Sequence, residues 1–491
     1  MTTSDQDVEP CLLPATELAR RLRRKDFSAT ELLQHHLTRV DRLNPAINAV
    51  VVLRAEAALA RAAEADAALA RGELWGPLHG VPITVKEAFD LTGTATTWGF
   101  EAQRNNIATS NAVAVQRLMD AGAVVFGKTN VPVALADWQS FNPVYGTSNN
   151  PWDLDRSPGG SSGGSAAALA AGLSALELGS DIGSSIRNPA HYCGVWGHKP
   201  TWGLVPVQGQ QLPGDECIDA LDINVVGPLA RSAHDLSLAM DILATPLSCF
   251  GPMGRTPAVW RDSGLPARQL RVAVMCDDPR AEVDAPIRQA LETLADFLGR
   301  SGLTVSTKAR PVDSEAAWQT FIPLLRGTLA GHMGDADYNA ALAEAAATGP
   351  GTEFPAAHWR GITQSHRDWL RIENQRHAMR RQWAAFFEHW DLLISPIATT
   401  TAIHHNHEGY RWQRMIPVNG QPQPHTTQLF WAGYSGVVGL PSTAVPLGLS
   451  PAGLPIGAQV IGPAFGDPVC LRFARWLETE YRGFVPPPMA L

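Results

Sequence analysis

The pattern of apolar residues at the start of the chain predicts helices. Ser28 and Glu31 have the spacing of a helix-capping box, and leucine and valine residues follow at helical intervals as far as Val40. A second helix is predicted over residues 54–71, because that stretch is rich in alanine, the best helix former. We therefore expect residues 1–72 to form an N-terminal helical part.

After Gly76 the pattern changes to short apolar runs beside glycines. Residues 81–85 and 124–126 are predicted to be buried strands, and residues 111–122 between them a helix. A helix that connects two strands is typical of an α/β fold. The alanine-rich stretch 166–178 is predicted to be a further buried helix.

The same alternation continues through the rest of the chain. Helices are expected over residues 232–243 and 285–302, and strands over residues 270–275, 303–306, 391–396, 442–447 and 456–461. Residues 311–361 interrupt the alternation with several glycines and aromatic residues, and a loose insertion of this kind often covers a pocket. A helical excursion on the surface, with no role in binding, fits the pattern equally well.

Composition and charge restrict the class of protein. The 491 residues carry a formal net charge of −8, with a pI near 6.0, which argues against a nucleic acid or an anionic membrane as the main partner. Residues 1–10 lack the basic and apolar segments of a signal peptide, and no stretch is long and apolar enough to cross a membrane. We therefore expect a cytoplasmic protein.

The length leaves open two domains or one unusually large sheet. The six cysteines form no C-x-x-C pair and are expected to be free thiols in a reducing compartment, with Cys193 as a packing residue. Three tryptophans, Trp196, Trp202 and Trp431, are expected to lie in the core.

Two glycine turns carry serines, and one lysine precedes them. Ser161 lies in the turn 159–164, Ser185 lies in the turn 183–185, and Lys86 closes an apolar run. A serine hydroxyl is a poor nucleophile without a neighbouring base, and a lysine becomes such a base when burial lowers its pKa. The set therefore predicts a serine hydrolase that works without histidine. One serine would be the nucleophile, and the other would pass a proton between it and the lysine.

Two other motif strings occur, and their context argues against both. Residues 122–129 fit the phosphate-binding P-loop, but their four middle residues are predicted to be the strand itself, whereas a P-loop follows its strand. Residues 159–163 fit the G-x-S-x-G nucleophile elbow, but residues 151–158 before them have no strand pattern.

A cluster of histidines raises a metal site as an alternative. His404, His405, His407 and Glu408 are candidate ligands. Side chains this close in sequence cannot easily converge on one ion, so an exposed loop near the substrate entrance is favoured. We expect neither a metal nor another cofactor.

The order Lys86, Ser161, Ser185 and the residues around it resemble the amidase signature family. Matching segments are spread over most of the chain, at residues 80–82, 127–130, 158–165, 180–187, 189–190, 193–194, 199–201, 227–231, 439–441 and 453–457. The resemblance implies one large α/β domain over residues 1–491, in which helices cover both faces of a twisted mixed sheet.

The resemblance also assigns roles within this chain. It implies Ser185 as the acylated nucleophile, Ser161 as a bridging serine after a cis peptide bond, and Lys86 as the general base. The remaining implied roles are oxyanion N–H groups at Ile182, Gly183, Ser184 and Ser185, supporting residues Gly160, Ser162, Asp181 and Arg187, and pocket residues Asp137, Trp138 and Gln139, for which ordinary packing is the alternative. The chain departs from the family at Ser184, where glycine is usual.

The implied reaction is hydrolysis of a carboxylic amide C–N bond through an acyl-enzyme on Ser185. Fifteen tryptophans and the aromatic residues around the expected pocket favour neutral apolar or aryl amides, and the same chemistry extends to carbamates (urethanes) and esters. The expected partners are the substrate and water, and a homodimer is left open. Two alternatives are a glutamine amidotransferase-type subunit of a tRNA-dependent complex and a non-catalytic binding protein of the same fold.

Overall fold

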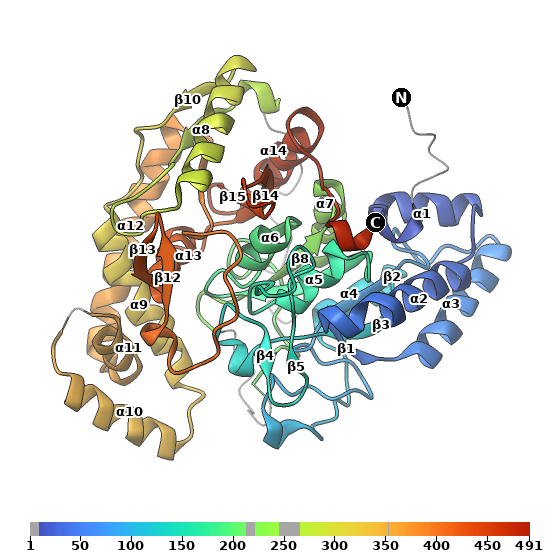
Figure 1. Cartoon of the computed structure of the whole chain (residues 1–491), viewed down its shortest axis with the longest axis horizontal. Helices are drawn as coiled ribbons and strands as arrows, with labels where there is room; N and C mark the ends of the chain where they lie inside the picture. Colours follow the sequence, from blue (N-terminus) through green and yellow to red (C-terminus); the bar gives the residue numbers. More distant parts are fainter. Residues whose placement is uncertain (1–8, 213–220, 245–265, 352) are drawn as a thin grey trace, which may run out of the picture.

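One mixed sheet crosses the molecule (Figure 1). The structure, a computed structural model, describes residues 9–212, 221–244, 266–351 and 353–491. In these residues eleven strands form the sheet, in the order β1 (Val50–Leu53), β3 (Val124–Thr129), β2 (Pro82–Lys86), β6 (Leu176–Asp181), β8 (Val225–Ala230), β7 (Trp196–Lys199), β14 (Ser442–Leu449), β15 (Pro455–Ile461), β11 (Leu392–Pro396), β9 (Arg271–Val274) and β10 (Thr304–Ser306). Two hairpins lie outside it, β4 (Phe141–Asn142) with β5 (Gly146–Thr147) and β12 (Met415–Val418) with β13 (Gln421–Pro424).

Helices cover both faces of the sheet in a single α/β domain. Helices α5 (Gly163–Ala170) and α6 (Arg187–Cys193) pack together against the central strands, and so do α7 (Ala233–Leu243) and α14 (Asp467–Glu480). The others are α1 (Ala15–Arg24), α2 (Ala29–Ile47), α3 (Ala55–Ala70), α4 (Val113–Asp120), α8 (Ala285–Arg300), α9 (Ser314–Ala330), α10 (Asp335–Thr348), α11 (Phe354–Thr363), α12 (His366–His389) and α13 (Leu429–Gly436). Figure 1 shows α1, α2 and α3 at one end of the molecule and α9 to α12 at the other.

Strand direction brings two polar residues to one edge of the sheet. Strand β2 pairs in parallel with β3 on one side and β6 on the other. The carboxyl ends of parallel strands meet at the same edge, so Lys86 at the end of β2 and Asp181 at the end of β6 lie on that edge together.

Several predicted elements are confirmed. The N–H of Glu31 donates to Oγ of Ser28 at 3.0 Å and the N–H of Ser28 donates to Oε2 of Glu31 at 2.8 Å, so the capping box is present. The helix predicted over 54–71 is α3. Residues 124–129 form β3, so the P-loop string is a strand and not a phosphate loop.

The prediction of one helix over residues 166–178 was wrong. Helix α5 ends at Ala170, and the chain continues into β6. Gly172 causes the break, because its φ of +70° is the left-handed conformation that ends helices and that glycine adopts without strain.

The loose insertion expected over residues 311–361 is instead the three helices α9, α10 and α11. Gly331 directly follows α9 and Gly349 directly follows α10, so both lie between helices. Gly327 lies within α9, where a Cβ atom would overlap the side chain of Gln364. The glycines therefore separate the helices or allow them to pack closely.

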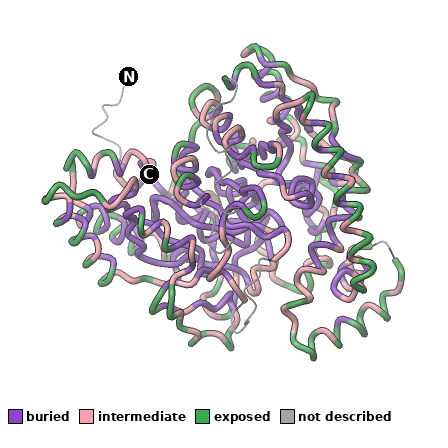
Figure 2. The backbone as a smooth tube through the Cα atoms, turned by 180° about the vertical axis from the view of Figure 1, so that it is seen from behind, coloured by how far each residue is buried: buried purple, intermediate pink, exposed green. Residues whose placement is uncertain are grey.

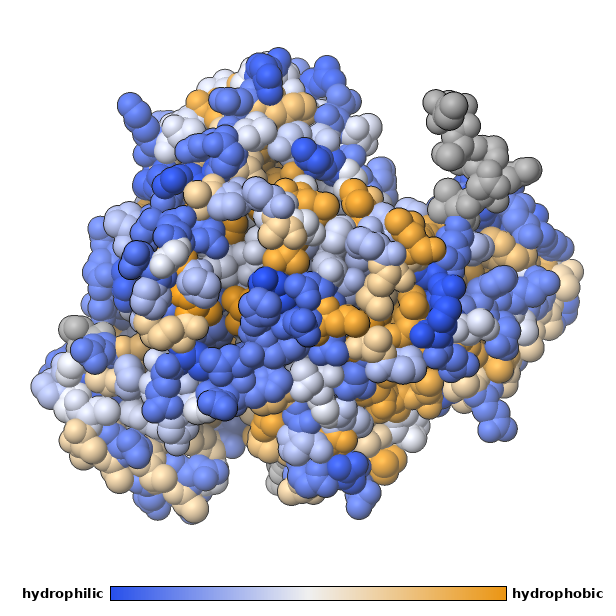
Figure 3. Space-filling view, viewed as in Figure 1, coloured by the Kyte–Doolittle hydropathy of each residue, from blue (hydrophilic) through white to orange (hydrophobic). Residues whose placement is uncertain are grey.

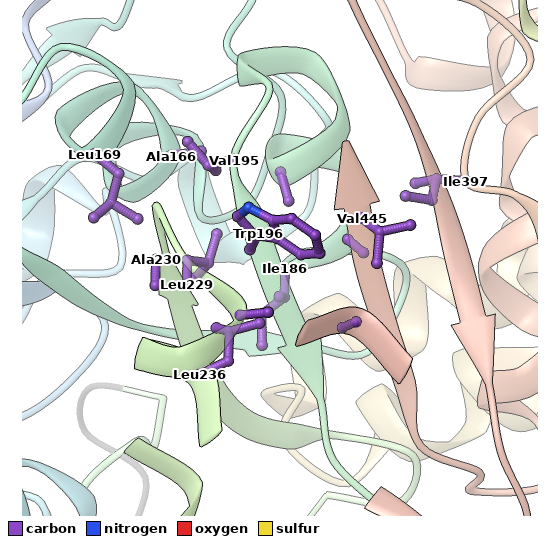
Figure 4. Close-up of a cluster of buried hydrophobic side chains, with 14 of the residues drawn as sticks. Ala166, Leu169, Ile186, Val195, Trp196, Leu229, Ala230, Leu236, Ile397 and Val445 are labelled. Carbon is purple, nitrogen blue, oxygen red and sulfur yellow. The ribbon is translucent and has the colours of Figure 1, made fainter. Parts of the chain in front are cut away.

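Buried residues are concentrated in the sheet and its inner helices, and exposed residues on the outer helices (Figure 2). Trp196 and Trp431 lie in the core as predicted, and Figure 4 shows Trp196 among Ile186, Leu229 and Val445. The prediction for Trp202 was wrong, since its side chain is 39% exposed. Four cysteines are free thiols, namely Cys11, Cys193, Cys276 and Cys470, while Cys217 and Cys249 lie outside the described residues.

None of the helices in the described ranges is both long and apolar enough to span a bilayer. On the face seen in Figure 3, hydrophobic residues lie in small groups between hydrophilic ones.

Candidate active site

Lys86 is the last residue of β2, and its side chain is fully buried. Its Nζ atom lies 2.7 Å from Oγ of Ser161 and donates a hydrogen bond to Oγ of Ser180 at 3.0 Å. Burial lowers the pKa of Lys86 to about 7, although the carboxylate of Asp181 opposes this change. An amine with this pKa is partly neutral near pH 7 and can accept a proton.

Ser161 lies in the turn that leads into α5, after a cis peptide bond from Gly160. Only glycine fits at position 160, because a Cβ atom there would overlap the carbonyl oxygen of Asp137. The N–H of Ser162 donates to the carbonyl oxygen of Ser185 at 3.1 Å. This bond joins the two serine turns directly.

The carboxylate of Asp181 shapes the second serine turn. It accepts hydrogen bonds from the N–H groups of Ser184 at 2.9 Å and Ile186 at 3.1 Å. The guanidinium of Arg187 donates two further bonds to it, at 2.8 and 2.9 Å, and both charged side chains are fully buried. Burial alone would raise the pKa of Asp181, but Arg187 holds it at about 2. The turn is therefore built around an ionised carboxylate.

Ser184 and Ser185 have different environments within this turn. Ser185 lines a cavity, whereas Oγ of Ser184 is buried without a hydrogen-bond partner and its φ is +76°. The expectation that Ser184 supplies a free oxyanion N–H group is not met, because that N–H donates to Asp181. The N–H groups of Ile182, Gly183 and Ser185 have no acceptor within the described part of the chain.

The cavity at Ser185 has about 630 Å³ of empty space, including its open mouth. Trp138 forms one wall, and its indole N–H donates to the carbonyl oxygen of Gly183 at 2.7 Å. Most other lining residues are apolar or aromatic, among them Trp98, Ala134, Leu135, Ala136, Leu221, Leu325, Leu329 and Leu429. The hydroxyl of Ser185 therefore faces a largely apolar space.

The structure separates the three residues expected to line the pocket. Asp137 and Trp138 line the Ser185 cavity, and Oδ2 of Asp137 accepts a hydrogen bond from Arg414 at 2.6 Å. Gln139 instead borders a neighbouring cavity, where its amide exchanges hydrogen bonds with the backbone of Asn406 at 2.7 and 2.9 Å. Gln139 therefore holds a loop in place and does not face Ser185.

A larger apolar cavity adjoins the first and has about 1340 Å³ of empty space. Helix α9 contributes Arg326 and Leu329 to both cavities, and α11 adds Trp359 and Ile362 to the larger one. Residues of the stretch 311–361 thus form part of the wall around the space that Ser185 faces.

Sequence reasoning missed two side-chain amides that line the Ser185 cavity and connect to Lys86 through Ser180. Nε2 of Gln210 donates to Oγ of Ser180 at 2.9 Å, and Nδ2 of Asn224 donates to Oε1 of Gln210 at 3.0 Å. Ser180 could have been found, because it precedes Asp181 on the strand next to Lys86. Gln210 and Asn224 lie in loops that no motif marks.

The histidine segment 404–407 lies beside the neighbouring cavity rather than the one at Ser185. His404 and His405 border that neighbouring cavity, and the ring of His407 stacks on Phe141 at 3.8 Å. Across the described residues, no group of three or more His, Cys, Asp or Glu side chains is arranged to hold a metal ion.

Known proteins match this chain over nearly its whole length. The indoleacetamide hydrolase of Bradyrhizobium diazoefficiens is 32% identical over 95% of this chain and 86% of its own length. A glutamyl-tRNA(Gln) amidotransferase subunit of Acidothermus cellulolyticus is 31% identical over 95% of this chain and 94% of its own.

Solved structures extend the similarity to the fold. One of them belongs to a vestigial protein complex that reveals the evolutionary origins of an s-triazine catabolic enzyme. It is 29% identical, has a TM-score of 0.80, and the match covers 96% of this chain and 99% of that one. A sequence model of the amidase family matches residues 31–471. The chain therefore belongs to the amidase family, that of the amidase signature enzymes.

Proposed function

We propose that this chain hydrolyses carboxylic amides through an acyl-enzyme on Ser185. The observation that carries the proposal is the 2.7 Å contact between Lys86 Nζ and Ser161 Oγ, beside a turn that presents Ser185 to a cavity. Neutral Lys86 takes the proton of Ser161 while Ser161 takes that of Ser185, whose oxygen attacks the carbonyl carbon. The proton returns along the same path to the departing amine, and water then releases the acyl group.

The N–H groups around Ser185 complete the chemistry. Those of Ile182, Gly183 and Ser185 are available to stabilise the oxyanion of the tetrahedral intermediate. The mostly apolar walls of both cavities support a substrate whose acyl or amine group is apolar or aromatic. The relative from Bradyrhizobium diazoefficiens is named for indoleacetamide, an amide whose acyl group carries an aromatic ring. Carbamates and esters pass through the same tetrahedral intermediate and are included in the proposal.

A substrate panel tests this proposal. Initial rates are measured for indole-3-acetamide, an aryl anilide, an aryl carbamate and the matching aryl ester. We expect turnover of the amides by the wild type and none by Ser185→Ala, with circular dichroism showing that the variant is folded. Amide turnover that survives in Ser185→Ala would contradict the proposal.

Similarity to the amidotransferase protein of Acidothermus cellulolyticus supports a second candidate function. That relative is about as similar to this chain as the indoleacetamide hydrolase is. Release of ammonia from glutamine, with no turnover of aryl amides, would favour the amidotransferase function over the one proposed above.

A further inference from the structure

Among the described residues, two arginines in the walls of the Ser185 cavity form no ion pair with an acidic side chain. Arg326 lies on α9 and Arg411 in the 3-10 turn Arg411–Gln413, and both side chains line the Ser185 cavity and the larger one beside it. Arg326 is only 3% exposed, and its Nε and Nη2 atoms have no hydrogen-bond partner. The guanidinium of the half-buried Arg411 makes no hydrogen bond or ion pair within the described ranges.

The acidic side chains around the two arginines are few, and none of them forms an ion pair with either guanidinium among the described residues. Among the described lining residues of the two cavities, the carboxylates are Asp137 and Asp337. Asp137 is bound by Arg414, and its charge also acts on Arg411 from a distance, whereas Asp337 is exposed at the rim. His358 also faces the larger cavity, and burial, reinforced by Arg326 and Arg411, lowers the pKa of its imidazole to about 2. The imidazole is therefore uncharged at neutral pH and adds no counterion.

An unpaired buried guanidinium is unfavourable, so its presence requires an explanation. Proteins pair buried charges or use them to bind a ligand, because removing a charge from water without a partner costs several kcal/mol. The guanidinium of Arg326 lies 5.5 Å from the centre of the Phe354 ring, which stabilises the cation but satisfies none of its N–H groups. Those N–H groups are free for an acceptor in the cavity.

We infer that Arg326 and Arg411 bind a carboxylate of the substrate, so that the preferred substrate is an amide that carries one carboxylate on an apolar body. The planar fork of a guanidinium matches the two oxygens of a carboxylate, which makes arginine the side chain of choice for this group. The inference rests on the proposed amide hydrolysis and departs from the neutral substrate that the sequence predicts, because a count of aromatic residues says nothing about charges in the pocket.

Matched substrates separate charge from shape. Succinyl 4-nitroanilide is compared with 4-methylpentanoyl 4-nitroanilide, whose isopropyl group has the shape of the carboxylate. In the first pair the carboxylate or isopropyl group is on the acyl group of the amide. In the second pair, 4-acetamidobenzoate and 4-isopropylacetanilide, it is on the amine group. We expect kcat/KM to be about 30-fold higher for the acid of at least one pair, the size expected for hydrogen bonds to a charged group. The pair that responds shows which side of the amide the arginines face.

Variants then assign that preference to the two arginines. Arg326→Met and Arg411→Met should each lower the ratio of kcat/KM for the acid to kcat/KM for its neutral isostere by about 10-fold or more. Arg326→Lys should restore only part of this ratio, because lysine cannot form the two-pronged contact. Arg367→Met is the matched control, since it removes an exposed arginine on α12 and should leave both rates unchanged.

The outcomes distinguish this inference from the function on which it depends. If the wild type hydrolyses the neutral amides as fast as the acids, or if both methionine variants keep the preference, the arginines do not bind a substrate carboxylate although amide hydrolysis stands. If no amide is turned over, isothermal titration calorimetry with Ser185→Ala measures the affinity for each acid and for its neutral isostere. This comparison does not depend on catalysis. Equal affinity for acid and isostere there also overturns the inference.

Discussion

Nζ of Lys86 and Oγ of Ser161 lie 2.7 Å apart in a part of the protein that solvent hardly reaches. The two residues are 75 positions apart in the chain. Their contact depends on β2 ending beside β6, at the edge of the sheet where both serine turns lie. The reaction proposed for Ser185 therefore depends on the ionisation of Lys86.

Amide turnover should rise with pH through about pH 7 and then level off. Lys86 must be neutral to accept a proton, and burial lowers its pKa to about 7. In Lys86→Met this ionisation should disappear from the profile of kcat/KM, with amide turnover reduced by about 1000-fold or more. The matching ester should lose less, because an alkoxide leaving group needs a proton less than an amine does. Equal losses for ester and amide would remove Lys86 from the acid–base role.

The same lysine should make the free energy of unfolding depend on pH. Between the folded pKa of about 7 and the ordinary value of 10.5, the unfolded chain binds more protons than the folded one. The cost of burying Lys86 is therefore absent above that interval, grows as pH falls through it, and is complete below about pH 7. Urea denaturation should show a smaller slope of stability against pH in Lys86→Met. Part of the slope should remain, because burial also lowers the pKa of Lys199 to about 7. An unchanged slope in the variant would contradict the buried, neutral lysine.

Asp181→Asn should move the pH profile toward lower pH. The carboxylate of Asp181 raises the pKa of Lys86 against the effect of burial, so its removal lowers that pKa further. The variant should also lose about 3–5 kcal/mol of stability, because Arg187 is left buried and unpaired. The double variant Asp181→Asn/Arg187→Met has no unpaired arginine, so it should recover part of the lost stability. Its pH profile of amide turnover should stay shifted toward lower pH. A shift toward higher pH would be inconsistent with the arrangement described.

Ser184→Gly should stabilise the protein by about 1 kcal/mol and leave amide turnover largely intact. The φ of +76° at Ser184 is unfavourable for a residue with a Cβ atom, and its buried Oγ has no partner. Thermal denaturation and initial rates measure both effects. Loss of all activity in this variant would mean that Ser184 and not Ser185 forms the acyl-enzyme.

Local patterns were sufficient to predict much of the fold. The capping box at Ser28, the alanine-rich α3 and the run that becomes β2 each depend on a few consecutive residues. The predictions were wrong at two glycines, because glycine can either end a helix or lie inside one where helices pack closely. Gly172 ends a helix that the apolar pattern would continue, and Gly327 lies inside a helix that its presence seemed to exclude.

Some residues of the candidate site could be predicted from the sequence, and others could not. Lys86, Ser161 and Ser185 stand in distinctive local sequences, and their roles in the site remain predictions. The side chains that reach the site from distant loops and helices are different, because Gln210, Arg326 and Arg411 belong to no motif. Only the packing of α9 against α11, α12 and α13, and of the turn at Arg411 against the 3-10 turn His425–Gln428, brings the two arginines to the cavity. That neither guanidinium forms an ion pair among the described residues is visible only once every neighbour is known.

The most direct test is to identify the residue that carries the acyl group. The protein is mixed with an activated aryl amide, quenched in acid, digested and analysed by tandem mass spectrometry, and a sulfonyl fluoride is used in parallel. We predict one adduct per chain, on Ser185, which persists in Ser184→Gly and is absent in Ser185→Ala. An adduct on Ser184 or Ser161, or continued amide turnover without any serine adduct, would contradict the account.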